Sequence, residues 1–304
     1  MSLETDSLID RRRLKRRLNT WRVIAILALL GAVIVALSRS MHAPWQKPFV
    51  ARFEISGLIS EDRERDETLA DIAKDNAIRA LIVHINSPGG TVVGGENLYR
   101  ELRQVAARKP VVAVMGTLAT SGGYMTALGA DYIVARSGSI TGSIGVILQT
   151  TDVTGLLEKL GISTEAIKSA PLKAVPNPLE PLTEEGREAT KAVVMDMYNL
   201  FVDMVTERRQ LPRETALKLA DGRVYSGRQA AENKLIDALG GETEARDWLA
   251  VERNIPISTP VRDVRIERRG EGLLGMMESI VGKALFSERL TLDGLVSLWH
   301  PDLH

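Results

Sequence analysis

The chain has 304 residues, of which 44% are hydrophobic, and its 39 Lys and Arg are matched by 39 Asp and Glu. This balance argues against a nucleic-acid-binding protein, which usually has a clear basic excess. The chain contains no cysteine, which excludes disulfides, thiolate zinc sites and cysteine nucleophiles. Its length suits one large globular domain or two small ones.

Residues 23–38 form an uncharged apolar run that predicts a transmembrane helix, extended by snorkelling Arg22 and Arg39. By the positive-inside rule, residues 1–22 stay in the cytoplasm and the rest of the chain is exported across a bacterial inner membrane. Residues 39–47 then form a linker. The small residues at 36 and 38 leave a cleavable signal peptide open as an alternative. The cations before the run are Arg11, Arg12, Arg13, Lys15, Arg16, Arg17 and Arg22.

Apolar strand-like runs alternate with helix-like segments between residues 48 and 252, which predicts one α/β domain with a mainly parallel sheet. The expected strands are 49–59, 80–86, 111–115, 132–135 and 144–148. The expected helices are 64–76, 96–108, 121–130, 152–160, 183–210, 213–220 and 227–233.

Residues 253–304 form a C-terminal extension with a different pattern. A strand is expected at 261–268. Apolar residues at helical spacing predict a helix at 273–286. That helix suits docking on a partner subunit or on the membrane surface, and equally suits packing on its own domain.

Three glycine-rich loops each lie beside an apolar strand: NSPGGT (86–91), GTLATSGGY (116–124) and TGSIGV (141–146). Loops at the carboxyl ends of parallel strands converge on one crevice, where ligands bind. Glycine pairs let backbone N–H groups point into such a crevice. A phosphate-binding loop is the weaker interpretation, because neither GxxxxGK[ST] nor GxGxxG occurs.

Ser121 begins an expected helix, where free N–H groups and the positive end of the helix dipole favour a developing negative charge. Ser121 is therefore a candidate nucleophile. The N–H of Gly122, with that of Gly89 or Gly90, is a candidate oxyanion hole. The alternative is that Ser121 is merely an N-cap and the glycines merely form turns.

A serine nucleophile needs a base, and histidine is a poor source here. His84 lies inside an apolar strand, and the other three histidines lie beside the membrane segment or at the C-terminus. Lys173 lies in APLKAVP (170–176), an almost wholly apolar segment in which an amine is more easily held neutral. Lys168 is the second candidate.

Taken together, these motifs resemble signal peptide peptidase A, a family of membrane-bound Ser–Lys peptidases with a ClpP/crotonase-type fold. The resemblance covers about residues 50–250. The motifs that carry it are INSPGGTVVGGENLY (85–99), TSGGY (120–124), GSIGV (142–146), IKSAPLKAVPNPLEPLTEEGR (167–187) and DGRVYSGRQAAENKLIDALGG (221–241).

The resemblance implies Ser121 as nucleophile, Lys173 as general base and Ser143 as a hydrogen-bond partner of the lysine. It places Gly89, Gly90 and Gly122 where oxyanion donors are expected. It also implies spiral βα repeats, peptide substrates such as cleaved signal peptides, and a homo-oligomeric ring in which neighbouring subunits share each site. No cofactor or metal is expected. The alternatives are a crotonase-like acyl-CoA enzyme and a non-catalytic membrane scaffold of the same fold.

Overall fold

A computed structural model of the chain describes residues 21–31, 47–266 and 296–298. Contacts within the chain divide it into two compact units, Met1–Lys47 and Pro48–His304. The first unit contributes one described segment, a helix over residues 21–31 whose apolar side chains are exposed. Among the residues that the structure describes, no helix is both long and apolar enough to cross a membrane. Residues 32–38 lie outside the described ranges, so the transmembrane helix stays a prediction.

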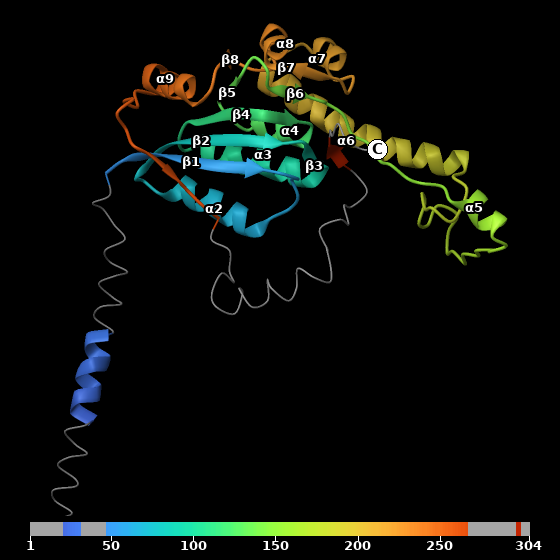
Figure 1. Cartoon of the computed structure of the whole chain (residues 1–304), viewed down its shortest axis with the longest axis horizontal. Helices are drawn as coiled ribbons and strands as arrows, with labels where there is room; N and C mark the ends of the chain where they lie inside the picture. Colours follow the sequence, from blue (N-terminus) through green and yellow to red (C-terminus); the bar gives the residue numbers. More distant parts are fainter. Residues whose placement is uncertain (1–20, 32–46, 267–295, 299–304) are drawn as a thin grey trace, which may run out of the picture. The chain divides into compact units, whose positions relative to one another are not determined.

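The second unit is built on a mainly parallel sheet, as the sequence predicts (Figure 1). Its strands run in the order β7-β6-β4-β2-β1-β9, with β5 and β8 continuing from β4; only the β6–β7 pair is antiparallel. The strands are β1 (Phe49–Ser56), β2 (Ile78–Ser87), β4 (Val111–Thr120), β5 (Tyr132–Ala135), β6 (Ile140–Gly142), β7 (Val224–Ser226), β8 (Ala238–Leu239) and β9 (Val261–Asp263).

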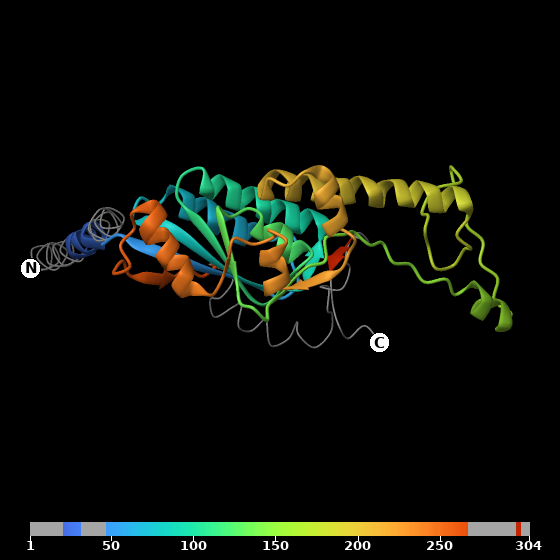
Figure 2. The same cartoon turned by 90° about the horizontal axis from the view of Figure 1, so that it is seen from above.

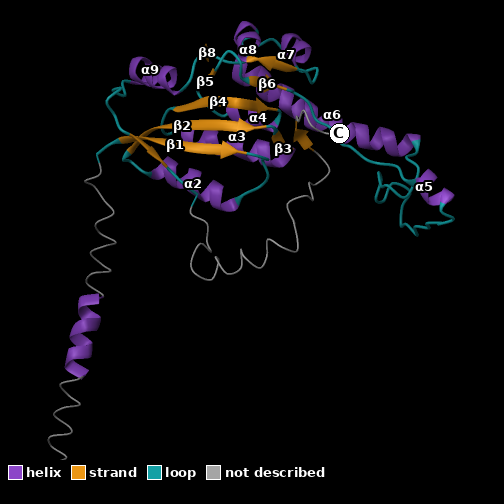
Figure 3. Cartoon of the chain, viewed as in Figure 1, coloured by secondary structure: helices purple, strands orange, loops and turns teal. Residues whose placement is uncertain are grey.

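Helices cover both faces of this sheet, as Figures 2 and 3 show. The helices are α2 (Arg63–Lys74), α3 (Val92–Ala106), α4 (Gly122–Ala127), α5 (Thr154–Lys159), α6 (Glu184–Arg209), α7 (Arg213–Leu219), α8 (Gly227–Glu232) and α9 (Glu242–Arg253). A small second sheet pairs β3 (Gly89–Thr91) with β10 (Val296–Leu298).

The hydrophobic core lies on both faces because the central strands are apolar at nearly every position. Alternate residues of β1 point to opposite sides, so Phe53 and Ile55 join the large cluster under α2, α3 and α6. Val50 belongs instead to a smaller cluster with Ala245 and Leu249 of α9. Burial on two faces explains why β2 and β4 read as continuous apolar runs.

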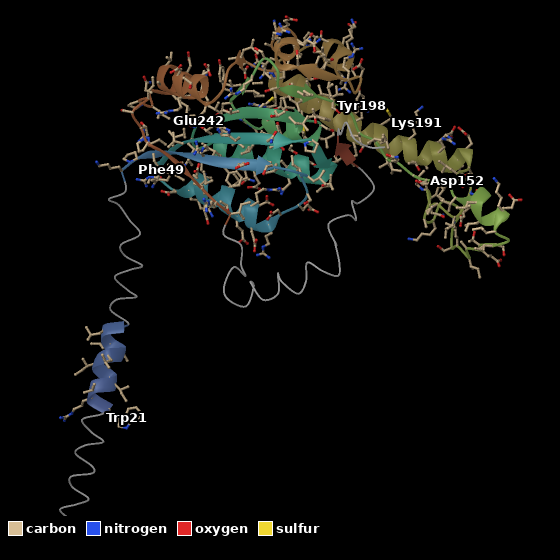
Figure 4. All side chains as sticks on the ribbon, in the orientation of Figure 1. Trp21, Phe49, Asp152, Lys191, Tyr198 and Glu242 are labelled. Atoms are coloured by element: carbon tan, nitrogen blue, oxygen red, sulfur yellow. The ribbon has the colours of Figure 1, made fainter. Side chains whose placement is uncertain are left out.

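One segment of this unit leaves the sheet. Figures 1 and 2 both show α5, the loop after it and the amino-terminal half of α6 extending beyond the carboxyl ends of the strands. The labelled side chains of Tyr198, Lys191 and Asp152 lie progressively farther from the sheet (Figure 4). We call residues 150–197 the arm. The carboxyl-terminal half of α6 packs into the core through Phe201, Val202 and Val205.

Several sequence-based expectations need correction. Residues 144–148 do not form the expected strand. The strand in this part of the chain is β6, which ends at Gly142, before the expected range begins. Helix α9 and the short strands β3, β7, β8 and β10 were not expected from the sequence. The helix expected at 273–286 lies outside the described residues.

Candidate active site

Ser121 stands at the sharp turn between β4 and α4. Its side chain is buried, and its backbone has φ 55° and ψ −118°, a conformation that a non-glycine residue rarely adopts. Such a conformation costs about 1–3 kcal/mol and persists only where neighbouring structure enforces it. The enforcing contacts are visible here. The Ser121 N–H donates to the Gly142 carbonyl at 2.8 Å, and the Ser121 carbonyl accepts the Met125 N–H at 2.9 Å.

The two glycines after Ser121 allow α4 to lie against the loop that follows β2. A Cβ on Gly123 would lie 2.9 Å from the Ser87 carbonyl oxygen, and a Cβ on Gly95 would lie 3.3 Å from the Gly122 Cα. Larger residues at these positions would push the helix start away. The glycines therefore do more than form a turn, because they bring the start of α4 against the other glycine loop.

That loop places Gly89 and Gly90 beside the turn. Thr120 holds the loop by donating its hydroxyl to the Pro88 carbonyl at 3.1 Å. Gly90 packs so closely on Ile59 that a Cβ would lie 1.8 Å from the Ile59 carbonyl oxygen. The Gly89 N–H already donates to the Ser87 hydroxyl at 3.0 Å. Of the two predicted donors in this loop, Gly89 is thus already engaged within the chain.

Ser143 comes from the neighbouring strand. Strand β6 pairs with the end of β4, which aligns Gly142 with Thr120. Ser143 follows with φ 50°, and its N–H donates to the Arg223 carbonyl at 2.8 Å. The structure therefore brings Ser121, Ser143 and the three predicted glycines together at the carboxyl ends of the strands.

Lys173 lies elsewhere, in the exposed loop of the arm. Figures 1 and 2 show that this loop and the start of α4 are apart in both views. The structure therefore does not bring Lys173 to Ser121 within one chain. Lys168, the second candidate, donates its ammonium to the Glu180 carboxylate. This ion pair holds the Lys168 ammonium within the arm, on a partner other than the serine.

The arm also exposes many apolar side chains that a lone chain leaves in water. Ile167 is 98% exposed, and Leu160 is 64% exposed. Val193 and Met195 on α6 are likewise exposed. Large apolar side chains exposed along one segment are typical of a surface that another protein covers.

The edge of the site accepts an extended strand. Val296–Leu298, from the far end of the chain, pairs antiparallel with Gly89–Thr91, with Ser297 opposite Gly90. No sequence motif predicts this contact. It shows that backbone groups next to the predicted oxyanion hole can pair with an incoming strand.

His84 belongs to a different region. Its ring nitrogen Nε2 lies 2.9 Å from a carboxylate oxygen of Glu242, which also accepts Arg52 at 3.1 Å. Burial alone would raise the pKa of Glu242, but hydrogen bonds from Arg52 and His84 lower it below its ordinary value. His84 is thus held on the α9 side of the sheet. Among the described residues, no cluster of three or more His, Asp or Glu could hold a metal ion.

Comparison with known proteins is consistent with this geometry. Residues 103–256 match the family model described as Peptidase family S49. A Synechocystis protein named as a protease is 40% identical over 202 residues, which cover 66% of this chain and 73% of the relative. An Enterococcus faecium protein named signal peptide peptidase SppA is 34% identical, covering 64% of this chain and 56% of the relative.

Two more distant matches are a plant protein and a solved structure. The Arabidopsis thaliana serine protease SPPA, chloroplastic, is 33% identical and covers 79% of this chain but 35% of its own length. Among solved structures, a membrane-bound stomatin-specific protease matches 72% of this chain with a TM-score of 0.46 and 15% identity. This chain spans about three quarters of the first of these relatives and smaller shares of the others.

Proposed function

Because the chain belongs to peptidase family S49, and is a serine peptidase by that membership, we propose that Ser121 is its nucleophile and Lys173 its general base. The observation that carries this proposal is the backbone of Ser121. It is a non-glycine residue held at positive φ between a buried strand and a helix start, beside three glycine-rich loops. Similar strained turns present nucleophilic serines in other hydrolases.

The proposed reaction follows from the positions of these groups. The Ser121 hydroxyl oxygen attacks the scissile carbonyl while neutral Lys173 takes the hydroxyl proton, and Lys173 then protonates the leaving amine. The N–H groups of Gly122 and Gly90 stabilise the negative oxygen of the tetrahedral intermediate. A single donor of this kind contributes about 10²–10³ in rate. Ser143 orients the lysine amine. Water then releases the acyl group from Ser121.

Substrates in this proposal are extended, largely apolar peptides, including cleaved signal peptides. Support for an extended substrate comes from β3, whose edge pairs with a strand of the chain itself. Main-chain pairing binds peptides with little regard to sequence, and pockets for alternate side chains add selectivity. The relatives named as signal peptide peptidases point to the same substrate class.

The proposed base reaches the nucleophile across a subunit interface. Lys173 lies in an arm that leaves the sheet on the side of the strand ends that carry Ser121. In this proposal, the exposed apolar side chains of the arm are buried against a second copy of the chain. Head-to-tail repetition of this contact closes into a ring. We also propose that the domain has the spiral fold of the ClpP/crotonase type.

The location in this proposal is a bacterial inner membrane, with residues 23–38 as a single-pass anchor, residues 1–22 in the cytoplasm and the peptidase domain outside. The basic residues before the apolar run support this orientation. The exposed apolar side chains of the helix over residues 21–31 suit a lipid environment.

The test is hydrolysis of a labelled apolar signal-peptide fragment by the purified chain and by Ser121→Ala. We expect the variant to lose hydrolysis while keeping its melting temperature. Ser137→Ala, an exposed serine near the same sheet, should keep full activity. Full activity in Ser121→Ala, or turnover of an acyl-CoA in place of the peptide, would overturn the proposal.

A further inference from the structure

A strongly basic hollow lies at the opposite end of the sheet from Ser121. It occupies 650 Å³ at the amino ends of β2 and β4, next to the end of α9. Five cations line it and no acidic residue does. They are Lys74, Arg79, Arg108, Lys109 and Arg253.

Part of this charge has no ion-pair partner in the protein. Among the described residues, no acidic group lies within ion-pair distance of Arg79 or Arg108, whose side chains are exposed. Arg253 lies over the Trp248 ring at 5.0 Å. The neighbouring acids are Asp71, which is 3.9 Å from Lys74, together with Asp75 and Glu252.

Lys109 forms the floor of the hollow. Its ammonium donates to the backbone carbonyls of Ile72 at 2.6 Å and Asp75 at 2.7 Å, and its side chain is buried. The Lys109 ammonium therefore adds a buried cation to the exposed guanidinium groups of Arg79 and Arg108. A concave cluster of guanidinium and ammonium groups of this kind suits phosphate, which guanidinium binds in a bidentate manner.

The position of the hollow indicates which phosphate-bearing ligand it would meet. Phe49 begins β1 at this end of the domain, as Figure 4 shows, and it pairs with Ile78, which lines the hollow. The linker 39–47 can span at most about 30 Å between the predicted anchor and this point. The chain that passes the hollow at Arg253 and Ile255 continues to Ile257, whose apolar side chain is 54% exposed. Cations interleaved with exposed apolar groups are typical of surfaces that contact anionic lipid.

We propose that this basic hollow binds the phosphate headgroups of anionic phospholipids in the membrane that anchors the chain. The proposal rests on the proposed anchor at residues 23–38. Headgroup binding by the hollow would hold the amino ends of the strands against the bilayer. Since β4 has 10 residues, Ser121 then stands roughly 30 Å from the headgroups. Substrate peptides are therefore cut after they have left the bilayer.

The test uses the full chain in nanodiscs of phosphatidylcholine, with or without phosphatidylglycerol. Because the chain has no cysteine, Asn76→Cys at the hollow gives a single labelling site for a fluorophore. A headgroup-labelled quencher lipid reports its contact with the membrane. We expect strong quenching in the anionic discs, several-fold weaker quenching in the neutral discs, and weakening by salt.

The charge variants decide whether the hollow is responsible. Arg79→Gln with Arg108→Gln should reduce quenching in anionic discs to the level of neutral discs. Lys218→Gln with Arg228→Gln, which removes the same charge from α7 and α8, should leave it unchanged. Equal quenching in both lipids, or an equal loss with both variant pairs, would overturn the proposal.

The failure of this inference can be told apart from failure of the proposed function. Arg79→Gln with Arg108→Gln should hydrolyse peptide at the normal rate, because neither residue touches the site. A chain that does not enter the discs would refute the anchor. Headgroup binding is then measured by flotation with vesicles of the same two compositions, where the arginine pair should weaken binding about tenfold. An unchanged flotation would again overturn it.

Discussion

The two regions that carry the proposed nucleophile and base differ in almost every physical respect. Ser121 is buried, fixed by hydrogen bonds on both sides and surrounded by core. Lys173 is exposed, lies in a loop without helix or strand, and is flanked by apolar residues that have no cover in a lone chain. One chain therefore fixes the position of the proposed nucleophile but does not place the proposed base beside it. This contrast suggests that assembly completes the site.

The largest expected effect is the loss of the base. Lys173→Ala should lower kcat by about 10²–10⁴, because general base catalysis contributes about that much. The melting temperature should not change, since the side chain is exposed. Steady-state kinetics with a peptide substrate measures this. Lys168→Ala is the matched control, and a larger loss there than in Lys173→Ala would show that Lys168 is the base.

Mixing two inactive variants tests directly whether the base crosses an interface. Ser121→Ala and Lys173→Ala chains, each inactive alone, are co-assembled in equal amounts. In a ring, random mixing pairs an intact Ser121 with a neighbour's intact Lys173 at about one interface in four. Recovery near a quarter of wild-type activity is therefore expected. No recovery, with co-assembly confirmed by tagged pull-down, would place both residues of the dyad in one chain.

The pH profile distinguishes a lysine base from a carboxylate. A lysine acts as a base only when neutral, so the rate should rise with pH on a limb well above that of a carboxylate, by up to about tenfold per unit. The profile is recorded with an uncharged substrate. A rising limb at about pH 4 would instead indicate Asp or Glu as the base.

Removing the strand that pairs with β3 should give a smaller, several-fold effect. A chain ending at Ile266 lacks β10 and leaves the edge of Gly89–Thr91 open to substrate. We expect a lower KM with little change in kcat. Ser297→Pro in the full chain is the control, because proline removes one ladder donor without removing the tail. An unchanged KM in both would mean that β10 does not compete with substrate.

The smallest expected effect concerns the face of the sheet away from the site. Glu242→Gln should cost about 1 kcal/mol of stability at pH 7, because Arg52 and Glu242 are partly exposed and their interaction is screened. The pKa of Glu242 is lowered in the folded chain, so its contribution is present above the unfolded value near 4.3 and is lost as pH falls below it. The melting temperatures of the wild type and of Glu242→Gln should therefore differ at pH 7 and become equal at low pH. Peptide hydrolysis at pH 7 should be unaffected.

The sequence predicted those parts of the fold whose signal is local. The apolar runs of β2 and β4 predicted buried parallel strands. The long helix expected at 183–210 is α6, which Thr183 caps by accepting the Gly186 N–H with its hydroxyl. Helix α9 was missed although it carries a signal, since Glu244 caps Gly241 and Ala245 and Leu249 lie four residues apart. The apolar run at 144–148 did not form a strand because Gly142 and Ser143, with φ 82° and 50°, end β6 and turn the chain away from the sheet.

The site was predicted to the extent that its residues lie in local motifs. The serine and glycine loops meet because strand ends meet, which is a property of parallel sheets. The place of Lys173 could not be predicted, because it depends on how a 26-residue helix leaves the core. The β3–β10 contact was equally hidden, since a three-residue strand pairs with residues about two hundred positions earlier.

The arm also has a consequence for how much enzyme a cell must make. If each working centre needs two chains, activity per chain should rise steeply with abundance and vanish on dilution. A newly made copy would then be inactive until enough copies had gathered. In such a system the threshold is set by how strongly the arm binds the next chain. Weakening that contact at Val193 or Met195 would shift the threshold without altering the chemistry.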